Sequence, residues 1–519
     1  MVDVANKFGK AMRRRAELGD KVAFADTERE VTFAQFEQRV DKLIDALIRL
    51  GVRRGDRVAI LSRNCVSAVE CLATTKAGLI PVPLNWRLSP LELVNLLNDC
   101  RPAALICDES WAEVAERQIV GRFPQLVKIS FGNARAGWKQ YESVVASGDE
   151  AITHPQAKAN DTAFLIYTSG TTGVPKAAEI SHAALVENGE TSAREAICVG
   201  ETDTVLCVMP LFHVGGLCYY LIPSYLAGAT VILRPVFDCN ELVRVVSTQK
   251  VTNVHLVPTM ISDLVAHPDA RHALTNLKRI VYAGSSMPVA LLQRAMSLFS
   301  AIDLSQSYGS TEAGMISTLG PDEHRQAQSP EFAHLLRSCG RPLSGTTVRI
   351  VGEDGGDCPV NTPGEVFVRS NRTMVGYWNQ PEKTADVIAD GYLRTGDVGY
   401  VDGRGYLYLV DRKNDMIVTG GENVYPSEVE HVLYMSDDIA EAVVFGVPDS
   451  RWIEKVVAAV VLKPDSVITP EEIIEFAKTH LASYKCPKHV YVLDELPKSG
   501  AGKFSRKDLR HRFERIGAS

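Results

Sequence analysis

The chain has 519 residues, with 45% hydrophobic and 23% charged residues and a formal net charge of −7. These values are typical of a soluble globular protein with about three or four domains or subdomains, and they exclude a disordered chain, a collagen-like fibre and a small disulfide scaffold. The acidic balance argues against nucleic acid as a partner.

The termini and the cysteines bear on location. No run of about 18 apolar residues occurs, so no transmembrane helix is expected, and the apolar core of a secretory signal is missing. The Arg-rich segment 13–15 allows weak contact with a membrane surface, but a solvated helix face is favoured. The 11 cysteines are scattered without a CxxC pair, which argues against zinc and disulfides. We therefore expect a reduced, cytoplasmic protein.

Short apolar runs alternate with helical patterns up to about Pro342. The runs predict strands at 57–62, 78–84, 103–107, 163–169, 253–258, 279–286 and 302–309. Strands alternating with helices predict βαβ units and largely parallel sheets. Many runs end in small or polar residues, which places those residues at strand ends, where α/β folds hold their sites.

The pattern changes after Arg341. Strand-like runs separated by turn-rich segments predict a small β subdomain over about 342–411. Residues 415–519 contain a mixture of helices and strands that predicts an independent α+β domain. The predicted fold is therefore α/β: a large N-terminal domain (1–411) of two α/β subdomains plus the β subdomain, a hinge at 412–414 and the C-terminal domain.

The most informative motif is YTSGTTGVPK, residues 167–176, which follows an apolar strand. Glycines let the backbone approach an anion, hydroxyls add hydrogen-bond donors, and Lys176 adds positive charge. This composition suits phosphate groups, although it differs from the P-loop motif because no Ser or Thr follows Lys176. The alternative interpretation is a flexible surface loop.

Two further segments place polar side chains after apolar runs. In QSYGSTE, residues 306–312, a base can stack on Tyr308 and Glu312 can bind a hard cation. The alternative there is a helix capped by Ser310 or Thr311. In YLRTGD, residues 392–397, Asp397 can accept hydrogen bonds from two hydroxyls, as ribose recognition requires, or the segment can simply be a turn.

The last two segments lie at the junction and near the C-terminus. Residues 411–423 include paired glycines, which allow a ligand to approach the backbone, with a charged linker and hairpin turn as the alternative. In PKSGAGK, residues 497–503, Lys503 lies on a glycine-flanked loop and can bring its charge to a phosphoryl or carboxylate group. The other basic residues nearby are interpreted as a solvated helix.

Together these segments resemble the adenylate-forming superfamily of acyl-CoA synthetases, peptide-synthetase adenylation domains and firefly luciferase. The resemblance covers essentially the whole chain, and GGENVYPSEVE, residues 420–430, is similar to the CoA-ligase branch. It implies that a carboxylate attacks the α-phosphate of ATP in the presence of Mg²⁺, giving an acyl-adenylate and pyrophosphate, and that CoA then displaces AMP. It also implies a mobile C-terminal domain, because one lysine cannot serve both steps from one position.

The resemblance implies roles for individual residues. Lys503 bridges the carboxylate and the α-phosphate, Thr311 contacts one of these groups, and Glu312 is the Mg²⁺ ligand. Tyr308 stacks on adenine and Asp397 accepts from the ribose. The nucleotide-binding residues are Thr168, Ser169, Gly170, Thr171, Thr172, Gly173, Lys176, Gln306, Ser307, Tyr308, Gly309, Asp397 and Arg412. Lys176 is also counted with the catalytic residues.

The same resemblance assigns CoA and the hinge. CoA is expected at Gly420, Gly421, Tyr484, Lys488 and Arg87. Asn414 stands at the hinge, where Asp or Lys is usual, and Cys486 replaces a bulkier or basic residue beside the expected CoA nucleotide.

The resemblance also outlines an acyl pocket. Its expected lining is His213, Val214, Gly215, Gly216, Tyr219, Val257, Met260, Ala283, Gly284, Ser285, Ser307, Met315 and Ile316. His213 resembles an aromatic gate, with a core histidine as the alternative. The lining has no Arg or Lys, which disfavours a dicarboxylate because its second charge would be unpaired. With room at Gly215 and Gly216, the expected substrate is a hydrophobic monocarboxylate, either fatty or aryl.

Two other functions remain open at this point. One is an acyl-AMP ligase that loads a carrier protein, and the other is a non-catalytic nucleotide-binding scaffold. The paired glycines 420–421 and Lys488 favour free CoA. The scaffold is opposed by Lys176, Glu312, Asp397 and Lys503. A homodimer is expected from the family alone.

Overall fold

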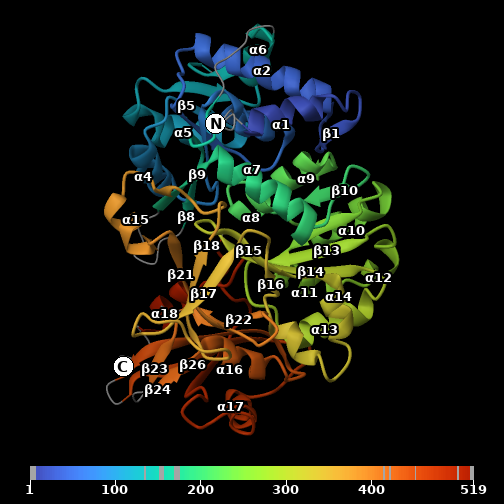
Figure 1. Ribbon diagram of the computed structural model, residues 1–519, viewed down its shortest axis with the longest axis vertical. Coiled ribbons are helices and arrows are strands. Elements are labelled where there is room, and N and C mark those ends of the chain that lie inside the picture. The colour runs from blue at the N-terminus through green and yellow to red at the C-terminus, as the bar shows by residue number, and fades with distance from the viewer. Residues whose placement is uncertain are drawn as a thin grey trace.

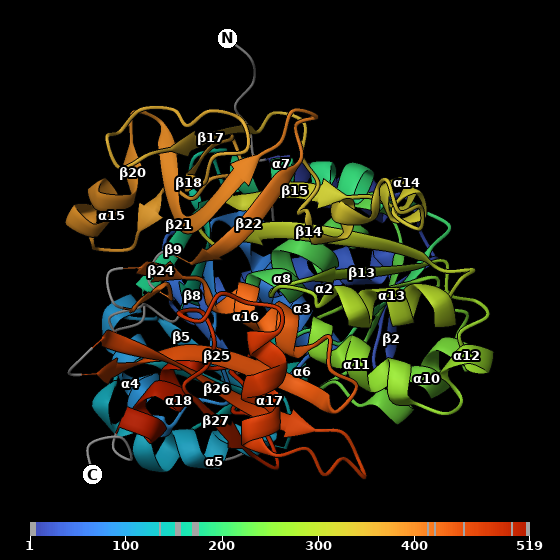
Figure 2. The same cartoon turned by 90° about the horizontal axis from the view of Figure 1, so that it is seen from below.

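The computed structural model describes residues 7–133, 136–150, 157–168, 176–412, 415–419, 422–449, 452–499 and 502–514. A large body contains the elements from α1 to β22, and the C-terminal domain, coloured orange to red, lies against one end of it (Figure 1). From below, in Figure 2, this domain lies in front of the body.

The largest sheet has nine strands in the order β16-β15-β14-β13-β12-β10-β11-β1-β2. They are β1 (Val22–Ala25), β2 (Glu30–Thr32), β10 (Thr204–Cys207), β11 (Thr230–Leu233), β12 (Asn253–Leu256), β13 (Arg279–Ala283), β14 (Asp303–Ser310), β15 (Gly314–Leu319) and β16 (Arg341–Pro342). Neighbours from β14 to β1 are parallel, and the edge strands β2, β15 and β16 pair antiparallel. The carboxyl ends of β12, β13 and β14, three of the predicted strands, therefore meet at one edge.

Helices cover both faces of this sheet (Figure 1). One face packs against α7 (His182–Thr191), which continues into the π-helical segment η3 (Ser192–Ala196). It also packs against the continuous segment α8 (Val214–Gly216), η4 (Leu217–Leu221) and α9 (Ile222–Ala227). The other packs against α10 (Cys239–Thr248), α11 (Pro258–Ala266) and α13 (Val289–Leu298), with α12 (Ala270–Ala273), α14 (Pro321–Gln326) and η5 (Ala333–Arg337) nearby. Alternate strand residues face opposite ways. Val281 therefore joins the first core, and Ile280 and Tyr282 join the second.

A second sheet is fully parallel, as predicted. Its order is β4-β3-β5-β6-β7, with β3 (Arg57–Leu61), β4 (Ile80–Pro83), β5 (Ala104–Cys107), β6 (Val127–Ser130) and β7 (Lys139–Gln140). The N-terminal helices are α1 (Lys7–Ala16), α2 (Phe33–Arg49), α3 (Val66–Ala73), α4 (Pro90–Cys100), α5 (Glu109–Gln118) and α6 (Tyr141–Ser147), with the turns η1 (Thr74–Ala77) and η2 (Val120–Arg122).

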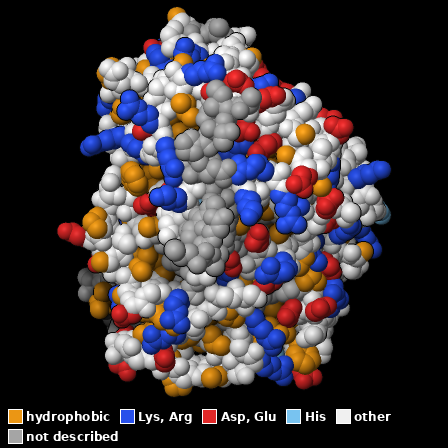
Figure 3. Space-filling view, turned by 45° about the horizontal axis from the view of Figure 1, so that its top comes forward, with side chains coloured by type: hydrophobic (Ala, Val, Ile, Leu, Met, Phe, Trp, Pro, Cys, Tyr) orange, Lys and Arg blue, Asp and Glu red, His pale blue; other side chains and the backbone are white. Residues whose placement is uncertain are grey.

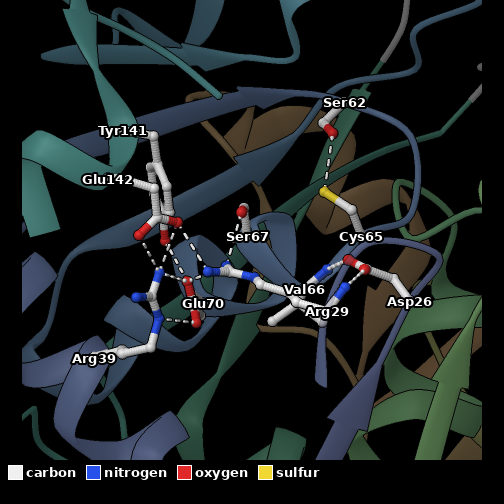
Figure 4. A network of polar contacts seen from close by, with 10 residues as sticks. All are labelled: Asp26, Arg29, Arg39, Ser62, Cys65, Val66, Ser67, Glu70, Tyr141 and Glu142. Atoms are coloured by element: carbon white, nitrogen blue, oxygen red, sulfur yellow. Dashed lines mark hydrogen bonds and ion pairs between the residues drawn. The ribbon is translucent and has the colours of Figure 1, made fainter. Parts of the chain in front are cut away.

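A buried carboxylate joins three of these helices. Glu70 of α3, with a fully buried side chain, lies 2.6 Å from Arg39 of α2 and 3.0 Å from Arg29. The hydroxyl of Tyr141, on α6, donates to the same carboxylate at 2.7 Å (Figure 4). A buried charge is tolerated when it is paired and hydrogen-bonded, so this network fixes α2, α3 and α6 relative to one another.

Two antiparallel sheets complete the body. The strands β8 (Thr162–Thr168), β9 (Lys176–Ser181) and β19 (Gly376–Tyr377) form one, which departs from the parallel arrangement predicted for this region. The β subdomain contains β17 (Thr347–Val351), β18 (Gly364–Arg369), β20 (Ile388–Ala389), β21 (Tyr392–Val401) and β22 (Leu407–Arg412), with α15 (Pro381–Val387). Its strands lie in the region predicted for a small β subdomain.

The C-terminal domain has the predicted mixture of elements. Its sheet contains β23 (Ile417–Thr419), β24 (Glu422–Val424), β25 (Ile439–Asp449), β26 (Ile453–Leu462) and β27 (His489–Val492). Its helices are α16 (Pro426–Leu433), α17 (Pro470–Lys478) and α18 (Arg506–Glu514). Arg506 donates to both oxygens of Glu430, at 2.7 and 2.8 Å, which joins α18 to α16.

The C-terminal domain touches the body at several points. Arg337, on η5, donates to His431 Nε2, on α16, at 2.7 Å. The Thr259 hydroxyl, on α11, donates to the Gly502 carbonyl at 3.2 Å. On the face in Figure 3, basic and acidic side chains are interspersed.

Candidate active site

The predicted phosphate loop connects two antiparallel strands. Thr168 ends β8 and pairs with Lys176, which begins β9, and the Thr168 hydroxyl donates to the Lys176 carbonyl at 3.4 Å. Ser169, Gly170, Thr171, Thr172 and Gly173 lie outside the described residues. Their contact with phosphate groups stays a prediction, supported by the position of the two residues that flank them.

Lys176 and Glu312 both contact one tyrosine. The Lys176 Nζ atom is 4.9 Å from the centre of the Tyr377 ring, and the Tyr377 hydroxyl donates to Glu312 Oε1 at 3.0 Å. Burial and the neighbouring Glu312 raise the pKa of Tyr377, so its hydroxyl stays a neutral donor. Sequence reasoning missed Tyr377, which lies on a strand of two residues that pairs with the distant β9.

Glu312 lies in the turn between β14 and β15, where a capped helix was the alternative prediction. That alternative is wrong, since the Ser310 hydroxyl accepts from the Ala313 amide at 3.1 Å within a turn between antiparallel strands. Thr311 is buried beside Glu312. Among the residues that the structure describes, no three His, Cys, Asp or Glu side chains gather to hold a metal. Mg²⁺ in phosphate sites needs one or two carboxylates with phosphates and water, so Glu312 fits as its protein ligand.

The predicted adenine and ribose residues are in contact. The Tyr308 hydroxyl donates to Asp397 Oδ2, and both side chains are buried. Asp397 lies inside β21, opposite Arg412 of β22, so the turn proposed for this segment is wrong. The Arg412 side chain lies outside the described residues. Gln306 Nε2 donates to the Cys339 sulfur at 3.6 Å.

Gly309 lies between β15 and η4. A Cβ atom on Gly309 would lie 2.5 Å from the Gly314 carbonyl oxygen and 3.2 Å from the Tyr219 hydroxyl. That hydroxyl donates to the Ser310 carbonyl. Glycine is therefore needed here for the close approach of β14, β15 and η4.

Lys503 reaches from the C-terminal domain to the strand ends of the body. A Cβ atom on Gly284 would lie 3.1 Å from Lys503 Cε and 3.3 Å from Val257 Cγ1. The preceding Gly502 lies against Val257 and Met260. The structure thus brings Gly502 and the predicted catalytic Lys503 against three residues of the predicted acyl pocket.

Two histidines lie beside this lysine. His213 Nδ1 accepts from the Gly215 amide at 3.1 Å, and a Cβ atom on Gly215 would lie 3.7 Å from Cε1 of His255, which is in β12. Burial, followed by the Lys503 cation, lowers the pKa of His213 to about 3. Burial, again with Lys503, lowers the pKa of His255 to about 4. Both imidazoles are therefore neutral near pH 7. His255 was missed because it lies within a run interpreted as a plain apolar strand.

The rest of the predicted acyl pocket differs from the prediction at Gly216. A Cβ atom on Gly216 would lie 2.5 Å from the Pro210 carbonyl oxygen, so this glycine is required by the backbone and leaves no room for substrate. Val214, Met315 and Ile316 are buried, whereas Ala283 and Ser285 flank Gly284 with partial or full exposure.

The predicted CoA residues are divided between the two domains. Gly420, Gly421 and the hinge residue Asn414 lie outside the described residues. On the body, Arg87 and Arg63 stack on Trp86, with their guanidinium carbons 4.6 and 5.1 Å from its ring centre. On the C-terminal domain, Tyr484 and Lys488 are exposed, with Lys488 Nζ donating to the Ser483 carbonyl at 2.8 Å, whereas Cys486 is buried.

Two family models match the chain. A family model described as AMP-binding enzyme matches residues 12–378, and one described as AMP-binding enzyme C-terminal domain matches residues 428–503. The chain belongs to the AMP-binding enzyme family. These two matches follow the order of the body and the C-terminal domain.

Relatives of this AMP-binding enzyme match it over nearly its full length. An indoleacetate–CoA ligase of Aromatoleum aromaticum is 35% identical over 94% of both chains. A feruloyl-CoA synthase of an Amycolatopsis species is 37% identical over 93% of this chain and 94% of its own. The solved o-succinylbenzoate CoA synthetase from Bacillus subtilis, in complex with its acyl-adenylate, is similar with a TM-score of 0.84 and 30% identity over 98% of each chain. In the part of the chain that the structure describes, no helix combines the length and apolarity needed to cross a bilayer.

Proposed function

We propose that the chain is an AMP-forming acid–CoA ligase that activates a hydrophobic monocarboxylic acid with ATP and transfers the acyl group to CoA. The position of Lys503 against Gly284 and Val257 carries this proposal. It places a cation of the small domain at the strand ends of the body, where a carboxylate and a phosphate would have to meet. Relatives that are CoA ligases support the reaction class.

In the first step, a carboxylate oxygen attacks the α-phosphorus of ATP and pyrophosphate leaves. Lys503 offsets the charge of the two anionic groups as they approach. Tyr308 and Asp397 hold the adenosine, while Lys176 faces the β- and γ-phosphates. Glu312 would hold Mg²⁺, which would supply further neutralisation of phosphate charge.

In the second step, the sulfur of CoA attacks the acyl carbon and AMP leaves. Lys503 lies at the strand ends in the present orientation of the C-terminal domain. A rotation of that domain would withdraw the lysine and present the segment that contains Gly420 and Gly421 instead. Lys503 would then serve the first step and these glycines the second.

The acid is proposed to carry one carboxylate and an apolar body. Val257 and Met260 are buried beside the Lys503 loop, and the two nearby imidazoles are neutral. A second carboxylate among these groups would have no counter-charge. Relatives named for indoleacetate and ferulate support a ring acid.

The test uses Lys503→Ala with two separate half-reactions. ATP–pyrophosphate exchange with the best acid of a fatty and aryl panel should fall about 100- to 1,000-fold, since a positioned charge is lost. Thioester formation from a supplied acyl-adenylate and CoA should be largely spared. Lys507→Ala, which changes an exposed lysine of the same domain, is the matched control and should affect neither.

Three results would contradict the proposal. Equal losses in both half-reactions would remove support for two positions of Lys503. Pyrophosphate exchange with no acid would favour a scaffold. Acyl transfer to a carrier protein, without transfer to CoA, would favour the carrier-loading function.

A further inference from the structure

A row of polar side chains lies inside the apolar layer between the nine-stranded sheet and the helices α7 to α9. In the register of β12, β13 and β14, His255 lies opposite Val281, and Val281 lies opposite Ser305. Since Val281 belongs to the core beneath these helices, His255 and Ser305 face the same way. Both are buried, and the Ser305 hydroxyl and both His255 nitrogens make no hydrogen bond.

The surroundings of His255 contain a second unpartnered group. The His255 ring, 4% exposed, packs 5.5 Å from the Tyr220 ring, whose hydroxyl is fully buried and also makes no hydrogen bond. Leaving a buried polar group unpaired costs about 1–3 kcal/mol, so a partner is expected. Tyr220 lies in η4, a π-helical segment. Such segments often occur at functional sites.

His255 lies near Lys503. Val257, two residues further along the chain, lies beside Gly284 and Lys503. β12 ends at Leu256 and Val257 continues in an extended conformation, so these two residues span about 7 Å. If an acid places its carboxylate at Lys503, as the proposed function requires, the body of a ring acid extends in the direction of His255.

The state of the ring determines which group it can bind. Burial and the Lys503 cation hold the pKa of His255 at about 4, so the imidazole is neutral and carries one donor and one acceptor nitrogen. The Gly215 carbonyl lies near enough to raise that pKa against the effect of burial, although the geometry is short of a hydrogen bond. When the ring N–H turns to this carbonyl, the other nitrogen is left as an acceptor. A cationic donor is disfavoured because Lys503 is near.

We propose that His255 is a specificity-determining residue that accepts a hydrogen bond from a neutral donor, a ring hydroxyl or a ring N–H, on the body of the acid. The substrate class is then a donor-bearing ring acid, and a plain fatty or unsubstituted aryl acid is a poor substrate. This inference rests on the proposed function.

The experiment compares matched acids with the full-length enzyme. The pairs are 4-hydroxycinnamate with cinnamate, 3-hydroxybenzoate with benzoate, and indole-3-acetate with its N-methyl derivative. In ATP–pyrophosphate exchange, the wild type should prefer the donor acid of its best pair by about 10- to 100-fold in kcat/KM. His255→Phe should reduce this preference to near one by losing activity on the donor acid alone. His255→Gln, which keeps an acceptor, should restore part of the preference.

A second buried histidine provides the control. His182→Phe makes the same change at a fully buried ring that lies beside Thr75, and it should leave the preference intact. Equal use of both members of every pair by the wild type would overturn the inference, as would a loss in His255→Phe that is equal for both acids. Exchange with no acid at all would instead overturn the proposed function, and the inference with it.

Discussion

At the scale of single residues, the contact between Tyr308 and Asp397 has a direct consequence for nucleotide binding. Tyr308→Phe keeps an aromatic face for the base but removes the hydroxyl that donates to the buried carboxylate. Hydrogen bonds to charged groups are worth about 1.5–3 kcal/mol, so the KM for ATP should rise about 10- to 100-fold with a smaller change in kcat.

Steady-state kinetics with varied ATP checks this expectation. Tyr282→Phe is the control, because it removes a buried hydroxyl from the neighbouring strand that bonds to His324 in the other core. It should lower stability without altering the KM for ATP. If both variants raised that KM equally, the effect would come from the sheet as a whole.

The roles of single residues could be predicted where those residues belong to a sequence motif. Glu312, Asp397 and Lys503 were singled out from their neighbours in sequence, and they lie in a turn, in a strand and at the end of a loop, respectively. Tyr377 and His255 could not be found that way. The residues that contact Tyr377 and His255 come from segments distant in the chain. An isolated Tyr or His in an apolar run carries no local signal of function.

At the scale of elements, the strands of the α/β region could be predicted because β-branched apolar runs have few other stable conformations. The antiparallel direction of β9 and the turn after β14 could not be predicted from the sequence. A turn and a helix start with the same residue types, and Ser310 bonds to the Ala313 amide in the same way as a helix cap. The close approach of the backbone around Gly309 and the φ of +74° at Gly314 favour the turn over a helix.

The paired glycines of α8 provide a matched test. In Gly216→Ala the new Cβ would lie 2.5 Å from the Pro210 carbonyl oxygen, so the free energy of unfolding should fall by about 1–3 kcal/mol. In Gly215→Ala the Cβ would lie 3.2 Å from His213 Nδ1 and 3.7 Å from His255 Cε1, which alters the site and spares the fold.

Denaturant unfolding and kinetics together separate these effects. Gly215→Ala should unfold near the wild-type midpoint while kcat/KM falls for the best acid. A Gly216→Ala variant as stable as the wild type, or a Gly215→Ala variant with unchanged kcat/KM for the best acid, would contradict these expectations.

At the scale of the whole molecule, the two-domain order could be predicted from the change in pattern near residue 411, but the orientation of the domains could not. The orientation depends on a few contacts between distant segments, such as Arg337 with His431 and Thr259 with Gly502. Each is a single hydrogen bond that leaves no periodic trace in the sequence.

The Arg337–His431 contact makes this orientation sensitive to pH. His431 accepts from Arg337, so it must be neutral, and burial together with Arg337 lowers the pKa of His431. The contact is fully present above the ordinary histidine pKa of about 6.5. It weakens as pH falls below that value and is lost as pH falls through the lowered pKa.

The rate of ATP–pyrophosphate exchange should therefore decline below about pH 6.5 more steeply in the wild type than in Arg337→Met, which lacks the contact at every pH. Near pH 8 the variant should be slower by a few-fold, since one partly exposed hydrogen bond contributes about 1 kcal/mol. Superimposable pH profiles would show that this contact does not influence the orientation.

The cation beside Gly284 belongs to the small domain and not to the body. With that domain elsewhere, the strand ends around Val257 and Met260 are left with apolar groups and two uncharged imidazoles. The body alone can then select a substrate by its shape but not by its charge. Discrimination between an acid and its ester or amide therefore requires both domains. It takes place when the C-terminal domain closes on the body.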